Sequence, residues 1–130
     1  MKNLLLTLVI VSLSFVGCSS DDDVPAQDSL EGNWSLVRIT GGIAGITDTI
    51  PPNVIKYNFS NGNLSVVNNN PEPDFSFLQT GNYTYELTTS NNQQVLVIND
   101  TTYEVISIDA EIFNLGDNRP VDGLAFAFER

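Results

Sequence analysis

The sequence predicts a small all-β domain, an eight-stranded antiparallel up-and-down barrel, over residues 30–130. Three observations indicate this fold. Short stretches rich in β-branched and aromatic residues alternate between apolar and polar positions. Asn, Gly and Pro separate these stretches, and no window keeps helical spacing for long. Sequential antiparallel strands in a small protein avoid exposed edges by closing into a barrel, so a two-sheet β-sandwich is the alternative.

The expected strands follow from the alternation, taken in order along the chain. They cover residues 33–40, 54–60, 63–68, 81–89, 94–99, 102–108, 111–115 and 122–129. Residues 41–52 hold three glycines and two prolines and are expected to form a long loop. Residues 69–79 are also expected to be loop, but they carry Phe75, Phe77 and Leu78, so this segment could be a lid.

The clearest hairpin joins residues 54–60 to residues 63–68. Asn61 and Gly62 both tolerate positive φ and suit a two-residue type I′ turn. This turn places Phe59 opposite Leu64 and Tyr57 opposite Val66. The apolar side chains of both strands therefore meet on one face, where cross-strand pairs stabilise a sheet.

The residues expected to face inward are rich in aromatic rings. An eight-stranded barrel is only wide enough for a packed core or for one small ligand, so an apolar pocket would be shallow. Tyrosine hydroxyls would then be the polar groups of such a pocket. The inward set is Trp34, Leu36, Ile55, Tyr57, Phe59, Leu64, Val66, Tyr83, Tyr85, Leu87, Tyr103, Val105, Leu124, Phe126 and Phe128, and the candidate pocket residues are Trp34, Tyr57, Phe59, Tyr83, Tyr85, Tyr103 and Phe126.

The N-terminus has the order of a secretion signal. Lys2 supplies a positive start, residues 4–16 are uncharged and apolar, and small residues precede Cys18. The apolar run is shorter than the ~20 residues that span a bilayer. The run Phe15, Val16, Gly17, Cys18 resembles a bacterial lipobox. The resemblance implies cleavage after residue 17, a diacylglycerol thioether on Cys18 and a further acyl chain, such as palmitate, on its amine.

Residues 18–29 are expected to be a disordered linker, because they combine charge with proline and lack periodicity. Ser20 followed by Asp21–Asp23 also resembles the surface-export signal of some Gram-negative groups. The protein is therefore expected on the outer membrane, at its periplasmic face or at the cell surface. The formal charge of −11 becomes one unit more negative when Lys2 is removed, which argues against a nucleic-acid partner.

The residue types exclude several kinds of catalysis. The chain has no histidine, and Cys18 is its one cysteine, so Ser-His and Cys-His mechanisms are absent and zinc or copper lacks its usual ligands. The acidic groupings are Asp109 with Glu111, Asp100 with Glu104, and Asp117 with Asp122, and they are interpreted as solvated turn residues. No enzyme activity, cofactor or metal site is expected.

The domain resembles the lipocalin-like domains of bacterial lipoproteins. Gly32, Asn33 and Trp34 match the Gly-x-Trp motif at the start of the first strand. The resemblance implies that an arginine from the end of the barrel covers the tryptophan at its base, and Arg130 matches that position. A cation–π contact would be the physical reason.

This resemblance implies a membrane-anchored, non-enzymatic protein that binds a small apolar or amphipathic molecule. The alternative is a surface protein-interaction, accessory or inhibitor module that uses residues 41–52 and 69–79 as its contact surface. Ile43, Ile46, Phe75, Phe77 and Leu78 would be its apolar contacts. Burial of these residues against the barrel wall would count against that alternative.

Overall fold

The structure is a computed structural model that describes residues 30–71, 77–119 and 121–130. The predicted signal, Cys18, the linker and Phe75 lie outside the described residues. The strands are β1 (Gly32–Gly41), β2 (Ile46–Thr49), β3 (Ile55–Ser60), β4 (Asn63–Asn68), β5 (Gly81–Ser90), β6 (Gln93–Ile98), β7 (Thr101–Ile108), β8 (Ile112–Asp117) and β9 (Leu124–Glu129).

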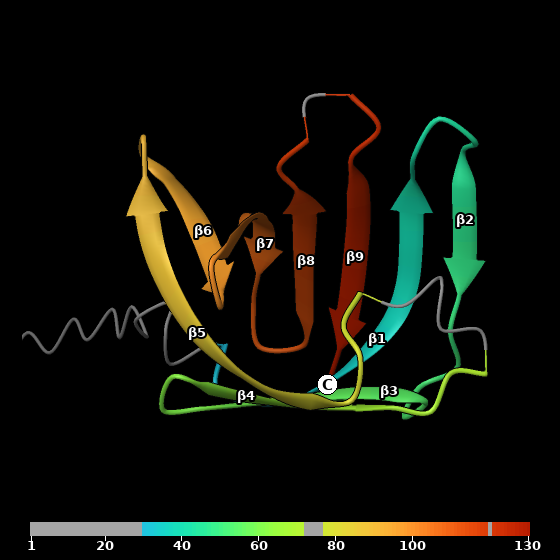
Figure 1. The fold of residues 1–130 in the computed structure, drawn as a ribbon, viewed down its shortest axis with the longest axis horizontal. Helices are drawn as coiled ribbons and strands as arrows, with labels where there is room; N and C mark the ends of the chain where they lie inside the picture. The colour runs from blue at the N-terminus through green and yellow to red at the C-terminus, as the bar shows by residue number, and fades with distance from the viewer. Residues whose placement is uncertain (1–29, 72–76, 120) are drawn as a thin grey trace, which may run out of the picture.

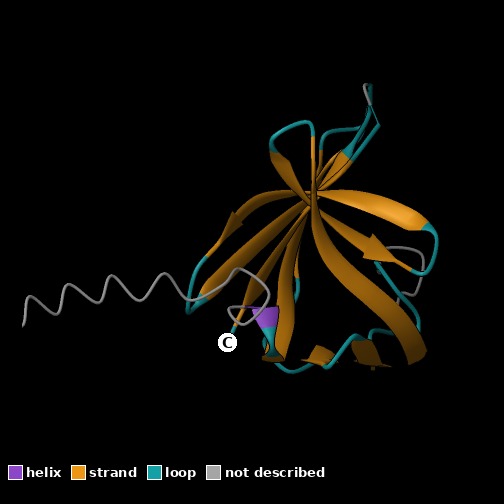
Figure 2. Ribbon diagram, turned by 90° about the vertical axis from the view of Figure 1, so that its left-hand side faces the viewer, coloured by secondary structure: helices purple, strands orange, loops and turns teal. Residues whose placement is uncertain are grey.

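Eight of these strands close into the predicted antiparallel barrel. Strand β1 pairs with β3, and from β3 to β8 each strand pairs with the next strand in the chain. The last strand, β9, returns to pair with β1 and closes the wall. That seam runs from Ser35 opposite Glu129 to Gly41 opposite Leu124, and Figure 1 shows β1 and β9 side by side. Figure 2 shows the strands, in orange, as the bulk of the described chain. The closed seam excludes the sandwich alternative.

Glycine is required at one end of this seam. Gly41 has a φ of +114°, and a Cβ atom placed there would lie 2.3 Å from the carbonyl oxygen of Gly123. Real Cβ atoms do not approach backbone oxygen this closely, so only glycine lets β1 meet the chain that leads into β9.

Asparagine-rich turns join the hairpins as predicted. Asn61 and Gly62 have φ angles of 50° and 78°, and the register pairs Phe59 with Leu64 and Tyr57 with Val66. The predicted hairpin is therefore confirmed. Asn91 and Asn92 also have positive φ and join β5 to β6, where a right-handed strand twist favours this turn.

The prediction that residues 41–52 are a loop is wrong, because they contain β2. Strand β3 pairs with β1 only from Gly32 to Ser35, which leaves the second half of that edge of β1 without a partner. β2 pairs with this half, from Arg38 opposite Thr49 to Gly41 opposite Ile46. An unpaired strand edge carries unsatisfied hydrogen-bonding groups, so the segment folds back along it.

Two β-bulges change which residues face inward. The β1–β9 register shifts at Val37, so that Arg38 points outward and Ile39 points into the core. The β7–β8 register shifts at Ile106, which is left exposed. A bulge inserts one unpaired residue and reverses the alternation after it, which strict alternation from sequence does not predict.

The core lies inside the barrel. Every residue of the predicted inward set is buried or packs against the buried cluster. The prediction missed further buried residues: Leu30, Val37, Ile39, Ile50, Leu96, Ile98, Phe113 and Leu115.

The base of the barrel is the end where Leu30 enters and Arg130 finishes the chain. Leu30 is fully buried, and its carbonyl oxygen accepts a 2.8 Å hydrogen bond from the indole N–H of Trp34. The Glu31 carboxylate accepts hydrogen bonds from the Tyr85 hydroxyl at 2.7 Å and from the Asn61 backbone N–H at 3.0 Å. Glu31 thereby links the entering chain to β5 and to the β3–β4 turn.

Replacing Glu31 with alanine should therefore lower the free energy of unfolding by about 1–2 kcal/mol. Hydrogen bonds to a charged acceptor contribute more than neutral ones, and the Tyr85 hydroxyl is partly buried, whereas water can replace the exposed bond to Asn61. Urea denaturation followed by circular dichroism measures the change. Glu129→Ala removes an exposed carboxylate from the last strand and should stay within about 0.5 kcal/mol of the wild type.

Candidate ligand site in the barrel interior

A chain of aromatic rings fills the barrel interior. Tyr57 contacts Phe128 edge to face with ring centroids 5.0 Å apart, and Phe59 contacts Tyr85 in the same way at 5.0 Å. Phe113 stacks on Phe128 at 5.2 Å. Such pairs contribute about 0.5–1.5 kcal/mol each beyond the area that they bury. The packed rings make this part of the interior a core.

Phe77 brings a further ring into the interior from the connection between β4 and β5. It stacks on Phe126 with centroids 4.3 Å apart and planes at 28°, and it meets Tyr103 edge to face at 4.7 Å. Its ring also lies nearly parallel to Tyr57, at 6.0 Å and 21°. We call Tyr57, Tyr103 and Phe126 the aromatic slot.

The Tyr57 hydroxyl is a buried polar group whose O–H donates to no described residue. The side chain is 0% exposed, and no contact of its oxygen with the described residues has the geometry of a full hydrogen bond. Burial raises the pKa of this phenol far above its ordinary value, and a weaker interaction with the Leu78 backbone N–H, which leaves the phenol proton undonated, lowers it by a smaller amount. An unsatisfied buried hydroxyl destabilises a fold by about 1–3 kcal/mol. The interior therefore holds a donor that is available to a bound molecule.

Half-buried residues lie at the end of the barrel opposite the base. Val54, Tyr83 and Leu124 are each partly exposed and pack against the core, close to the starts of β3, β5 and β9, and Tyr103 of the slot itself is also partly exposed, near the start of β7. Burial, followed by the charge of Asp117, raises the pKa of the Tyr103 phenol. The Tyr83 hydroxyl donates a 2.9 Å hydrogen bond to the Gln79 carbonyl oxygen. This end presents apolar surface with phenol groups at its edge.

The predicted pocket residues fall into two groups. Tyr57, Tyr103 and Phe126 meet at the slot, with Tyr83 beside it. The other group, Trp34, Phe59 and Tyr85, lies toward the base, where Trp34 packs on Phe113 at 5.6 Å and Phe59 on Tyr85. The side chain of Trp34 is 1% exposed and therefore acts as a core residue.

The structure brings Arg130 to Trp34. The guanidinium carbon lies 4.3 Å from the centroid of the indole ring, and Nη2 donates a 2.7 Å hydrogen bond to the Glu31 carbonyl oxygen. A guanidinium over an indole gains a cation–π attraction of about 0.5–1 kcal/mol at an exposed site. The pair covers the base of the barrel.

Phe77 is the slot neighbour that the candidate pocket omitted. Sequence reasoning placed it in a lid or contact loop, but Phe77 and Leu78 pack against the core. The signal was present, because Phe75, Phe77 and Leu78 stand together in a connection whose other residues are polar or proline. Because Phe77 and Leu78 are packed against the core, they are not available as contacts of the alternative, a protein-interaction module. Ile43, the other end of that expected contact surface, is 88% exposed.

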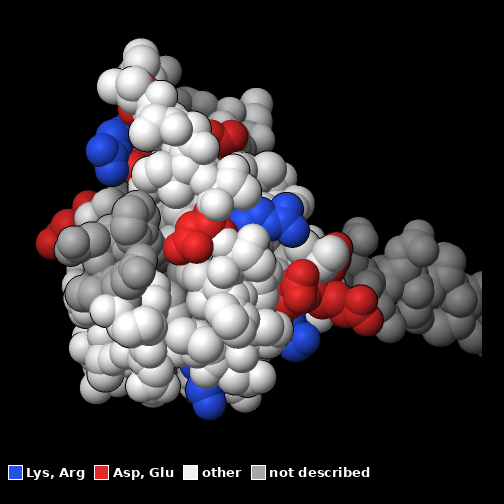
Figure 3. Space-filling model, turned by 90° about the vertical axis from the view of Figure 1, so that its right-hand side faces the viewer, with Lys and Arg blue, Asp and Glu red and all other residues white. Residues whose placement is uncertain are grey.

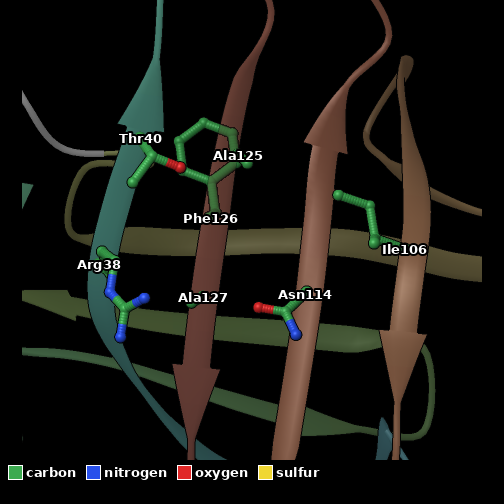
Figure 4. A pocket seen from close by; sticks show the side chains of 7 residues that line it. All are labelled: Arg38, Thr40, Ile106, Asn114, Ala125, Phe126 and Ala127. Carbon is green, nitrogen blue, oxygen red and sulfur yellow. The ribbon is translucent and has the colours of Figure 1, made fainter. Parts of the chain in front are cut away.

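A second hollow lies on the outer wall of the barrel (Figure 4). It measures about 200 Å³ and has a shallow floor where Ala125 and Ala127 stand on β9. Arg38 and Thr40 on β1 border one side of it, with Asn114 on β8 and Ile106 on β7 at the other. Both bulges border this groove, and the one at Val37 turns the Arg38 side chain outward. Its shallow, open form suits it less well to an apolar molecule than the slot.

In the described ranges, no group of three or more Asp, Glu, His or Cys side chains could hold a metal ion. Asp109 accepts bonds from the N–H groups of Glu111 and Ile112, which lower its pKa as part of a turn. Figure 3 shows basic and acidic side chains interspersed on one face. Among the described residues, no helix is long and apolar enough to cross a membrane.

Comparison with known proteins shows the fold. A crystal structure of a lipocalin-like protein from Bacteroides uniformis superposes with a TM-score of 0.51. The match covers 78% of this chain and 98% of that protein, with 13% sequence identity. No protein-family model and no curated protein sequence matches the chain. At this identity the likeness shows that the chain has a lipocalin-like barrel.

Proposed function

We propose that this lipocalin-like barrel is a non-enzymatic binding protein that takes up a small apolar or amphipathic molecule at the aromatic slot. The single observation that carries this proposal is the Tyr57 hydroxyl, which is fully buried without a hydrogen-bond partner among the described residues. Natural proteins rarely leave such a group unpaired, because no hydrogen bond then offsets the free-energy cost of removing the hydroxyl from water. A ligand with a hydrogen-bonding group would offset that cost.

The surroundings of the slot support an apolar or amphipathic ligand. Ligand pockets are mostly apolar, with a few placed polar groups that fix orientation. Here the rings of Tyr103 and Phe126 supply the apolar walls, and the hydroxyls of Tyr57 and Tyr83 supply polar groups. The acidic composition makes an anionic ligand less favourable than a neutral one.

We further propose that the protein is a lipoprotein anchored to the outer membrane by acyl chains on Cys18. The support is the order of the N-terminus, with Lys2, an apolar run and then Gly17 before the one cysteine. Several acyl chains together hold a protein firmly to a bilayer, because each buried methylene contributes about 0.8 kcal/mol. The acidic residues 18–29 would act as a spacer between that bilayer and the barrel.

Mass spectrometry of the protein purified from its own cells tests both parts. Under native conditions we expect a bound small molecule that is released on unfolding. Under denaturing conditions we expect a chain that begins at Cys18 and carries the added mass of acyl chains. The Cys18→Ala variant should lose the acyl mass and still retain the small molecule, because the two sites are independent.

Each part has its own contradictory outcome. Recovery of the unmodified chain with Lys2 still present would refute the anchor. A native spectrum with no small molecule, together with a stoichiometric protein partner, would refute ligand binding and favour the protein-interaction alternative through the exposed 41–52 segment.

A further inference from the structure

The ring of Phe77 lies against the three rings of the aromatic slot. Phe126 stacks on it at 4.3 Å, Tyr103 contacts it edge to face at 4.7 Å, and Tyr57 lies nearly parallel to it at 6.0 Å. Offset-stacked and edge-to-face geometries are the arrangements that aromatic rings prefer. The slot is therefore shaped for one benzene-sized ring.

Phe77 differs from the rings around it in how the chain holds it. Tyr57, Tyr103 and Phe126 stand on β3, β7 and β9, whose places are set by hydrogen-bonded neighbours on both sides. Phe77 stands on the connection between β4 and β5 and is partly exposed. A strand residue cannot leave the interior without opening the sheet, and this constraint does not apply to a residue outside the strands.

Side-chain hydrogen bonds of Asn68 and Tyr83 fasten described residues of this connection. The Asn68 amide Nδ2 donates to the Leu78 carbonyl oxygen at 2.9 Å, and the Asn68 backbone N–H donates to the Thr80 hydroxyl at 2.9 Å. The Tyr83 hydroxyl holds Gln79. These bonds involve residues 78–80, just after Phe77, and none of them is made by Phe77.

Phe77 also leaves the slot chemically incomplete. The Tyr57 O–H donates its proton to no described residue. A phenylalanine ring fills the space but offers no lone pair. A ring that carries a carbonyl or ether oxygen would fill the same space and also accept the Tyr57 proton.

We propose that Phe77 is an internal substitute for the ligand, and that the ligand carries a benzene-sized ring with a hydrogen-bond acceptor directed at the Tyr57 hydroxyl. This inference rests on the proposed function, because it names the class of molecule that the same slot accepts. Binding requires the Phe77 ring to leave, so the wild-type affinity is reduced by the competition.

The test uses Phe77→Ala and two probes that share a phenyl ring with a two-carbon substituent, acetophenone and ethylbenzene. The carbonyl oxygen of acetophenone can accept the Tyr57 proton, and ethylbenzene has no acceptor. In an NMR titration we expect the variant to bind both probes more tightly than the wild type. Acetophenone should bind at least about tenfold more tightly than ethylbenzene, and Phe77→Ala/Tyr57→Phe should lose that preference.

Leu78→Ala is the matched control, because it truncates the next residue of the connection and leaves the Phe77 ring in place. It should bind the probes no better than the wild type. If the alanine variant does not fold, Phe77→Val still removes the aromatic ring, vacates part of its volume and allows the same comparison between the two probes. A folded Phe77 variant that binds neither probe, or that binds both equally, would overturn the inference, as would an equal gain in Leu78→Ala.

These outcomes are separable from those for the proposed function. If the wild type keeps a small molecule from its own cells and the Phe77 variant binds neither probe, the inference about Phe77 fails and the proposed function stands. If the variant prefers acetophenone as expected and the wild type carries no small molecule from its cells, the slot is as inferred and the proposed function fails.

Discussion

Replacing Trp34 with alanine should lower the free energy of unfolding by about 3–5 kcal/mol, the usual cost of removing a buried large aromatic side chain. The indole is 1% exposed, packs on Phe113 at 5.6 Å and donates a hydrogen bond to the Leu30 carbonyl oxygen. Its loss leaves a cavity at the base and an unpaired carbonyl. Trp34 is the one tryptophan in the chain, so urea denaturation should be followed by circular dichroism.

Arg130→Ala distinguishes the contribution of the arginine to stability from the contribution of the buried tryptophan. It removes the guanidinium 4.3 Å from the indole centroid and the bond to the Glu31 carbonyl oxygen, while the tryptophan stays in place. The expected loss is about 1–2 kcal/mol, because the site is partly solvated. A loss for Trp34→Ala that is no larger than the loss for Arg130→Ala would contradict a core role for Trp34.

Replacing Tyr57 with phenylalanine should raise the free energy of unfolding at neutral pH by about 1–3 kcal/mol. The change removes a buried hydroxyl that has no partner among the described residues and keeps the ring contacts with Phe77 and Phe128. Tyr83→Phe is the matched control, since its hydroxyl does bond the Gln79 carbonyl oxygen, and it should be neutral or slightly destabilising. Destabilisation by Tyr57→Phe would show that the hydroxyl has a partner.

The same substitution should change the response to alkaline pH. Burial raises the pKa of Tyr57 in the folded state, and burial also raises that of Tyr103. Above the ordinary phenol pKa of about 10, the unfolded chain loses protons that the folded chain keeps. The contribution of each buried phenol to the free energy of unfolding is therefore fully present below pH 10. Above pH 10 the free energy of unfolding falls by up to about 1.4 kcal/mol per pH unit for each such group. Tyr57→Phe should make the fall shallower.

Much of the fold could be predicted because local chemistry and alternation agree. In the β3–β4 hairpin, Asn61 and Gly62 accept positive φ, and the turn they form sets the register that pairs Tyr57 with Val66. This turn signal is local, and the barrel preserves it. The pairing of Trp34 with Arg130 is not a local signal: the resemblance of the Gly-x-Trp motif implied it, and the structure places the guanidinium over the indole.

The sequence by itself determined the eight barrel strands, the tight turns and the aromatic inward face, because each depends on neighbours within a few residues. The tertiary structure decided the rest. The bulges at Val37 and Ile106 adjust the curvature of strands in a closed wall, and β2 forms because β3 covers only half of one edge of β1. Phe77 enters the slot because three strands distant in sequence leave a ring-sized space there. Such long-range packing has no periodic signature in the chain.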